Sequence, residues 1–244
     1  MSTTAQPSPT PTTSTFLSDM LDVFNVIHDP DAVFKRVSDR ARIVAPWIVL
    51  SVAVIIISIL MRPYQQAAFE AFKSTLSAEQ AAKMGNRGAG GGPLGLIFTP
   101  VVVLGMFAAG AGVLWIAVSI TGTQARYKTL FSVLAYSSIT YVLFAVVGIA
   151  VLMVRGKAGI TGFEDVRPPL GLDLVAPNAG LYLGGVLNGI NPFSVWGVWL
   201  AGTGVAITHR ISRSAAIGAT AVAYVICLLI ICVPYLFVAM MTKQ

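Results

Sequence analysis

Charged residues are scarce in this sequence, and their scarcity excludes most soluble folds. Only 11% of the 244 residues are charged, whereas 56% are hydrophobic. A soluble domain carries about 25% charged residues. Several segments continue for about 17 residues or more without a charge, which is the length that a bilayer core demands. The composition therefore predicts an all-α, polytopic membrane helix bundle.

The chemistry of a catalytic or ion-coupled site is also missing. No Asp, Glu, Lys, Arg or His lies in the core of a predicted span, although pumps and ion-coupled transporters usually carry such groups there. The acids of residues 155–180 match no calcium loop, so we expect a solvated loop. No Cys/His metal pattern or nucleophile motif occurs. We predict no enzyme activity, no cofactor and no metal site.

Basic residues form no cluster with interleaved aromatics, as a nucleic-acid surface would require. The net charge is +6, but the Lys and Arg residues sit at the ends of apolar segments. Such positions orient membrane spans relative to the bilayer. We therefore expect the lipid bilayer as a partner, with other membrane proteins or a second copy of the chain, and no nucleic acid.

The first 42 residues divide into a tail and an amphipathic region. Residues 1–15 are a Ser/Thr/Pro tract without a positive n-region, so we expect a disordered tail and no secretory signal. Residues 16–42 show apolar residues at helical spacing, and Asp29 is a natural cap for a helix that begins at Pro30 and includes Phe34. This pair of helices fits either the cytoplasmic membrane surface or a position packed on the protein's own bundle.

Residues 43–241 contain five predicted spans, at about 43–61, 94–120, 130–154, 193–208 and 215–241. Arg62-Pro63 is expected to end the first span, and residues 62–93 to form a polar loop. In the second span, small residues recur four apart, including Gly105 and Gly112. Because small residues let helix backbones approach closely in lipid, we expect these glycines to lie at a helix contact.

The segment Asn191-Pro192-Phe193-Ser-Val-Trp196 interrupts an apolar run. Asn191 can cap a helix whose first residue is Pro192. We predict that the fourth span starts here at the outer interface, with Trp196 as an anchor, and that residues 179–190 are interfacial. The rival interpretation is a single helix kinked at Pro192, whose mid-membrane break would favour transport.

Basic residues in short turns predict the orientation. The turns around Arg126 and Arg210 hold their charges within fewer than ten residues, and the residues before the first span are also basic. Charges in short loops and beside spans count most. We therefore expect a cell-membrane protein with a cytoplasmic N-terminus.

Three segments together resemble the YIP family of Rab-interacting, five-span membrane proteins, and its bacterial branch in particular. The first runs from Phe24 to Phe34 through Asp29-Pro30, and the second is Phe131-Ser-Val-Leu-Ala-Tyr136-Ser-Ser138. The third comprises Asn191 to Trp196, then Gly202-Thr-Gly204 and Arg210-Ile-Ser-Arg213. The candidate structural or interaction residues are Pro30, Phe34, Gly105, Gly112, Tyr136, Asn191, Pro192, Phe193, Trp196, Gly204 and Arg210.

The resemblance implies a five-helix bundle, a cytoplasmic N-terminus and no enzymatic activity. Eukaryotic members are linked to vesicle traffic and small GTPases. Their Asp-Leu-Tyr-Gly-Pro segment before the spans is missing here, and Gly171-Leu-Asp-Leu-Val lies in a loop, so small GTPase binding is not carried over. Two functions remain as hypotheses: a membrane-organising scaffold or interaction protein, and a subunit of a transporter or permease.

Overall fold

The computed structural model describes residues 16–79, 82 and 92–241, and the predicted tail 1–15 lies outside them. Within this part every regular element is helical. The helices are α1 (Phe16–Asn25), α2 (Pro30–Asp39), α3 (Val44–Ser74), α5 (Gly92–Ile120), α6 (Tyr127–Ser137), α7 (Ile139–Arg155), α8 (Gly180–Gly189), α9 (Pro192–His209) and α10 (Arg213–Met241). Three short 3-10 helices, η1 (Lys157–Gly159), η2 (Phe163–Val166) and η3 (Leu172–Val175), lie between α7 and α8. The predicted all-α fold is confirmed.

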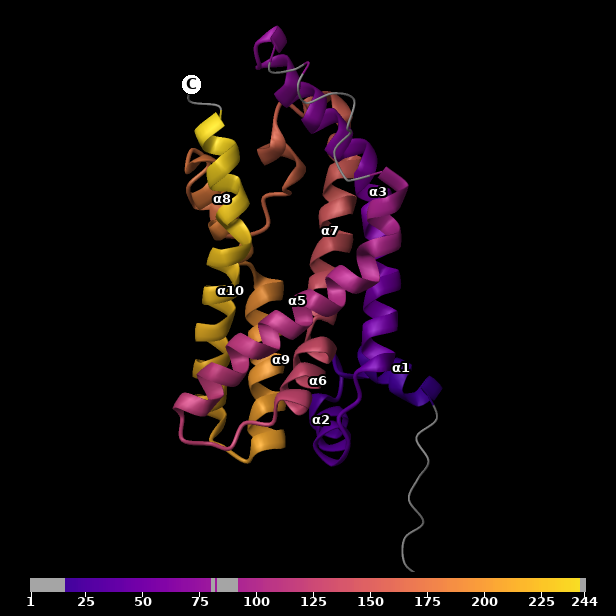
Figure 1. Ribbon diagram of the computed structural model, residues 1–244, viewed down its shortest axis with the longest axis vertical. Helices are drawn as coiled ribbons and strands as arrows, with labels where there is room; N and C mark the ends of the chain where they lie inside the picture. The colour runs from indigo at the N-terminus through magenta and orange to yellow at the C-terminus, as the bar shows by residue number, and fades with distance from the viewer. Residues whose placement is uncertain (1–15, 80–81, 83–91, 242–244) are drawn as a thin grey trace, which may run out of the picture.

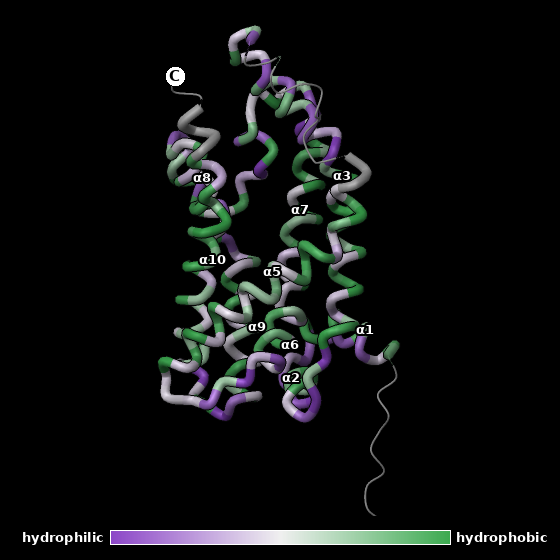
Figure 2. The backbone as a smooth tube through the Cα atoms, viewed as in Figure 1, coloured by the Kyte–Doolittle hydropathy of each residue, from purple (hydrophilic) through white to green (hydrophobic). Residues whose placement is uncertain are grey.

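The long helices supply four membrane-spanning units, or five when the bent pair of α8 and α9 is counted as one span. Four units are long and apolar enough to span a bilayer: α3, α5, α6 with α7, and α10. The fifth is the pair α8 and α9, which is bent by 52° at a short break. Hydrophilic residues gather at the two ends of the bundle (Figure 2). The start of α1 and the end of α10 lie at opposite ends of the bundle (Figure 1), as an odd number of crossings requires.

The two ends of the bundle differ in what they carry. The N-terminal end holds α1, α2 and the turns that join α5 to α6 and α9 to α10 (Figure 1). The loop end holds residues 156–179 and the last turns of α3 and α10. The turns at the N-terminal end contact each other, since the Arg126 side chain donates to the Thr208 carbonyl over 2.7 Å.

The sequence predicted that the first membrane helix ends at Arg62-Pro63, and this prediction was wrong. Helix α3 continues through Pro63 to Ser74 and has 31 residues. Beyond the proline, the buried residues Tyr64, Ala68 and Phe72 recur at helical spacing. Phe72 packs against Phe163 of η2 with ring centroids 5.3 Å apart. This packing maintains the helix, although a proline removes one backbone hydrogen bond.

The break between α8 and α9 is a capped helix start. The Asn191 side chain accepts from the Ser194 amide over 3.0 Å, and the Ser194 hydroxyl accepts from the Asn191 amide over 3.0 Å. Pro192 occupies the first helical position, where its missing amide hydrogen costs little. The prediction that a helix starts at Pro192 is confirmed.

The depth of this start differs from the prediction. Tyr224, near the middle of α10, donates to the Gly189 carbonyl over 2.6 Å. Earlier in α8, a Cβ on Gly185 would lie 3.1 Å from the Tyr235 ring. Helix α8 therefore descends along the second half of α10, and the break lies near mid-height. The outer-interface position of Pro192 and Trp196 was wrong because α8 supplies the outer part of the span.

Helices α2, α6 and α9 meet at one close contact in the main core. Phe34 and Val133 are fully buried. A Cβ on Gly204 would lie 2.7 Å from Val133 Cγ1 and 2.8 Å from Phe34 Cε1. Distances this short leave no room for a side chain, so glycine is required where these three helices approach.

In α5 the close helix contact is at Gly110, and Gly105 and Gly112 lie away from it. A Cβ on Gly105 or on Gly112 would meet nothing within 4 Å, whereas one on Gly110 would lie 2.8 Å from Leu134 Cδ2. Ala111 is fully buried next to Gly110. The prediction that Gly105 and Gly112 form the helix contact was therefore wrong. The spacing of small residues shows where another helix could approach the backbone, but it does not show which face of the helix meets a neighbour.

Replacing Gly204 by leucine should destabilise the bundle, and replacing Gly105 by leucine should not. Overpacking a core position costs about 1–3 kcal/mol, whereas the exposed face of α5 has room for the side chain. Thermal unfolding of both variants in the same detergent measures the difference. Equal midpoints for the two variants would contradict the assignment of the contact to Gly204.

Candidate functional site

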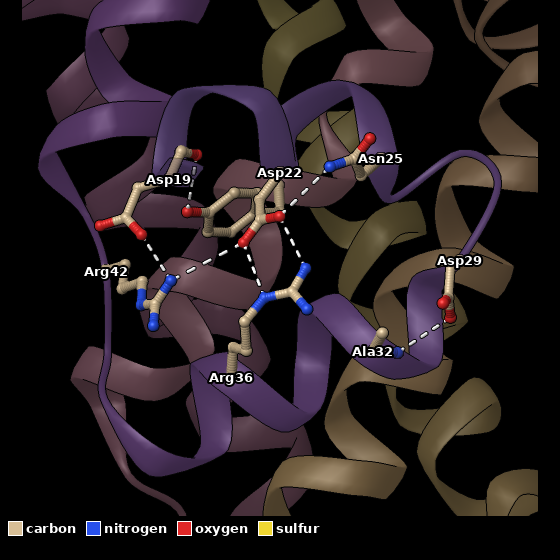
Figure 3. Close-up of polar contacts among 8 residues, drawn as sticks. Asp19, Asp22, Asn25, Asp29, Ala32, Arg36 and Arg42 are labelled. Atoms are coloured by element: carbon tan, nitrogen blue, oxygen red, sulfur yellow. Dashed lines mark hydrogen bonds and ion pairs between the residues drawn. The ribbon is translucent and has the colours of Figure 1, made fainter. Parts of the chain in front are cut away.

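A group of charged side chains fixes α1 to the chain that follows it. Asp22 is 3% exposed and accepts two hydrogen bonds from Arg36, over 2.6 and 2.9 Å. Arg42 pairs with Asp19 and lies 3.7 Å from Asp22. The Tyr136 hydroxyl, from α6, donates to the Asp19 carbonyl over 3.2 Å. We call these residues the N-terminal clamp (Figure 3).

The charges of the clamp balance, and its hydrogen bonds hold the charged groups in place. Two arginines face two aspartates, and the Asp22 hydrogen bond raises the pKa of the Arg36 guanidinium above its usual value. Both Asp22 and Arg42 are mostly buried, with side chains 4% and 12% exposed. Breaking a buried pair leaves an uncompensated charge, which is strongly destabilising. The clamp therefore determines which face of α1 points outward.

The outward face of α1 is apolar and has no partner among the described residues. Phe16, Leu17, Leu21 and Phe24 are each about half exposed or more, up to 69% at Leu17. The opposite face carries the buried Asp22 and Val23. We call the four exposed residues the α1 apolar face. Helix α1 projects sideways from the foot of α3 (Figure 1).

The sequence left open whether the two N-terminal helices lie on the membrane surface or pack on the bundle, and the structure answers this for α2. Helix α2 begins at Pro30 after Asp29, whose side chain accepts from the Ala32 amide over 3.0 Å. Its apolar residues Val33, Phe34 and Val37 are buried in the main core. Helix α2 thus packs its apolar residues on the bundle, whereas α1 buries Val23 and exposes its larger apolar residues.

A second group of polar side chains lies at the α8–α9 break. The loop before α8 reaches this point, since the Asn188 side chain donates to the Pro168 carbonyl over 2.8 Å and to Asp173 over 3.1 Å. The Leu172 amide donates to the Ile190 carbonyl over 3.0 Å. The expected solvated loop is therefore partly folded into the bundle, and Asp173 lies at the level of the break.

The remaining predicted residues occupy structural positions. Phe193 packs against Phe144 with ring centroids 6.1 Å apart, and Trp196 is half-buried one turn after the break. Tyr136 is fully buried. Arg210 ends α9 with φ of 53°. In the described part of the chain, no three His, Cys, Asp or Glu side chains gather as metal ligands would.

Sequence reasoning missed the clamp and the role of Asp173. Asp22 and Arg36 are 14 positions apart, and Asp19 and Arg42 are 23 apart, so no local spacing rule joins them. One signal was available for Asp22, because an acid between apolar positions of a short amphipathic helix is costly to bury without a partner.

Replacing Asp22 by asparagine should destabilise the protein by about 2 kcal/mol, since hydrogen bonds to charged groups contribute this much and Arg36 and Arg42 lose their shared acceptor. Thermal unfolding in detergent measures the loss. The matched control is Asp31→Asn, because the one ion pair of Asp31 with a described residue is an exposed pair with Arg213 at 3.5 Å, which is worth little. Equal losses in the two variants would contradict the role of the clamp.

Comparison with known proteins places this architecture in a family. The chain is 29% identical over 200 residues to the membrane protein YknW of Bacillus subtilis, covering 79% of this chain and 80% of the relative. No solved structure matches the chain. Residues 24–233 match the Yip1 domain, from the last turn of α1 into the second half of α10. The chain therefore belongs to the Yip1 domain family.

Proposed function

We propose that this protein organises the membrane by inserting α1 into one leaflet, without enzymatic activity. The single observation that carries the proposal is the α1 apolar face, which the clamp holds outward beside the start of α3. An exposed row of large apolar residues on an amphipathic helix is typical of a helix that lies in the membrane interface.

The energetics favour burial of this face in lipid. Transfer of a buried leucine or phenylalanine from water contributes about 1.5–3 kcal/mol. Val44, the first residue of α3, is 57% exposed, so the apolar surface of α1 adjoins that of a membrane span. The clamp prevents rotation of α1. The apolar face therefore gains the free energy of transfer into lipid only when α1 lies in the interface at the N-terminal end.

The double variant Leu17→Ser with Leu21→Ser should reduce the effect of the protein on vesicle shape. Each substitution removes about 2 kcal/mol of favourable insertion into lipid. Electron cryomicroscopy of proteoliposomes at a fixed protein-to-lipid ratio measures the distribution of vesicle diameters. We expect wild-type protein to shift this distribution towards smaller vesicles, and the double variant to resemble protein-free vesicles.

The matched control is Leu174→Ser with Val175→Ser, which removes exposed apolar surface in η3, beside the α8–α9 break and away from α1. This control should shape vesicles as the wild type does. If the two double variants behave alike, or if wild-type protein leaves diameters unchanged, α1 does not organise the membrane.

The proposal places α1 in the cytoplasmic leaflet. Arg126 and Arg210 lie in the turns after α5 and α9, and Arg213 begins α10. These turns lie at the same end of the bundle as α2 (Figure 1), which carries Lys35 and Arg36. Positive charges in short loops are held on the cytoplasmic side. The N-terminal end is therefore the cytoplasmic end of a multi-pass protein of the cell membrane.

Single cysteines in a protein with Cys227 and Cys232 replaced by alanine should report this orientation. A cysteine at Lys128 should resist a membrane-impermeant maleimide in intact cells and react after lysis. A cysteine at Lys157, exposed at the loop end, should react in intact cells. The reverse pattern would place α1 in the outer leaflet.

Transport is the second candidate, because the α8–α9 break lies at mid-height with Asp173 beside it. Broken helices at that depth form the sites of many transporters. Against this, Asn188, Asn191 and Ser194 already bond with one another, with Asp173 or with backbone groups. The polar groups at the break are thus already bonded within the protein, so we rank transport below membrane organisation.

Replacing Asp173 by asparagine tests the second candidate. In proteoliposomes with an internal pH dye, the organising function predicts equal, background proton leak for wild type and Asp173→Asn. Asn188→Asp serves as the paired control, since it adds a carboxylate at the same place. Proton flux in the wild type that Asp173→Asn abolishes would instead establish transport.

A further inference from the structure

A polar pocket of about 580 Å³ lies at the N-terminal end, between the end of α2 and the turns that follow α5 and α9. This volume falls in the range of small-molecule sites, about 300–1,000 Å³. Its polar lining includes Ser38, Asp39, Gln124, Arg126, His209 and Arg210. None of these residues belongs to the N-terminal clamp or to the α8–α9 break.

The charged groups of the pocket are two guanidinium groups and one carboxylate. Arg126 is positioned by its bond to the Thr208 carbonyl, over 2.7 Å. His209 contributes no charge, because its Nε2 accepts from the Arg126 amide over 3.1 Å and must be unprotonated to do so. Asp39 is exposed at the edge of the pocket and makes no ion pair with a described residue. The pocket therefore carries a net positive charge.

Arg210 is held in an unusual backbone conformation. Its φ of 53° makes it the one non-glycine residue with positive φ in the described part of the chain. Glycine or asparagine is preferred at such a helix end. The Arg210 guanidinium has no hydrogen bond or ion pair with a described residue. An arginine at a strained position with a free side chain points to a role for that side chain.

The pocket lies beside the end of α5, a helix long and apolar enough to span a membrane. The indole of Trp115, which is 44% exposed, donates to the Ala125 carbonyl of the pocket turn over 3.1 Å. Ile120, at the end of α5, is 80% exposed. A tryptophan with an apolar surround and a polar contact is typical of the headgroup level. A phospholipid headgroup at the level of Trp115 would reach the mouth of the pocket.

We infer that this pocket binds a phosphate group, with a phospholipid headgroup as its favoured source. Arginine forks match phosphate geometry and form charge-assisted hydrogen bonds with it. Arg210 supplies a free fork, Arg126 adds a second positive charge, and Ser38 and Gln124 offer neutral donors. The Asp39 carboxylate at the edge of the pocket can accept hydrogen bonds from the ammonium group of phosphoethanolamine. The site is independent of the α1 apolar face and of the proposed function.

Native mass spectrometry of the full chain in mild detergent tests the inference, with dihexanoyl-phosphatidylethanolamine as the titrated probe. Wild-type protein should bind one molecule, and Arg210→Gln should bind it about tenfold more weakly, as loss of a charge-assisted contact implies. Arg210→Gly removes the guanidinium and relieves the backbone strain, so it should unfold at the wild-type temperature or above and bind equally weakly.

The matched control is Lys128→Gln, because Lys128 is exposed at the same end but does not line the pocket. It should bind the probe as the wild type does. Equal affinity in all variants, or an equal loss in Lys128→Gln, would overturn the inference. Inorganic phosphate that displaces the lipid in an Arg210-dependent manner would support the phosphate site with a soluble source; failure to displace it would support the lipid source.

Discussion

Inside a bilayer the backbone has no water to bond, so each break in a helix must supply partners of its own. The start of α9 does this with the Asn191 and Ser194 side chains. The end of α8 does it with outside donors, because Tyr224 donates to the Gly189 carbonyl and the Leu172 amide donates to the Ile190 carbonyl. The loop before α8 must therefore fold into the bundle, and the packing at the loop end follows from this requirement.

The break between α6 and α7 meets the same requirement with less rearrangement. At Ser138 the amide still donates to the Leu134 carbonyl over 3.0 Å. Its hydroxyl donates to the same carbonyl over 2.8 Å. The two helices therefore remain one membrane span, and no loop is needed to complete the bonding.

The predictable parts of the fold are those that depend on neighbours in sequence. Apolar runs long enough to cross a bilayer predicted four spans and the α9 part of the fifth, and the Asp29-Pro30 and Asn191-Pro192 pairs predicted two helix starts. Each cap signal lies within a few residues, and each apolar run is one continuous segment. They are local because capping and hydrophobic length are local properties of a helix.

The unpredicted parts depend on contacts between distant segments. Pro63 indicates a helix end, but Phe163, a hundred positions away, packs on Phe72 and maintains α3. Gly105 and Gly204 both look suited to close packing, yet only Gly204 faces other helices. The depth of Pro192 depended on α8, whose ten residues are too few to be recognised as half of a span.

The clamp explains why the two N-terminal helices have different roles despite similar patterns. Both are amphipathic, and both have ten residues. Helix α2 places its apolar side in the core, and its Arg36 then holds Asp22 of α1 on the inner side. Since α1 turns its carboxylates inward to this arginine and to Arg42, its large apolar residues must turn outward. An ion-paired interior thus produces an apolar exterior, and that exterior lies at one end of the bundle, so its insertion would expand one leaflet more than the other.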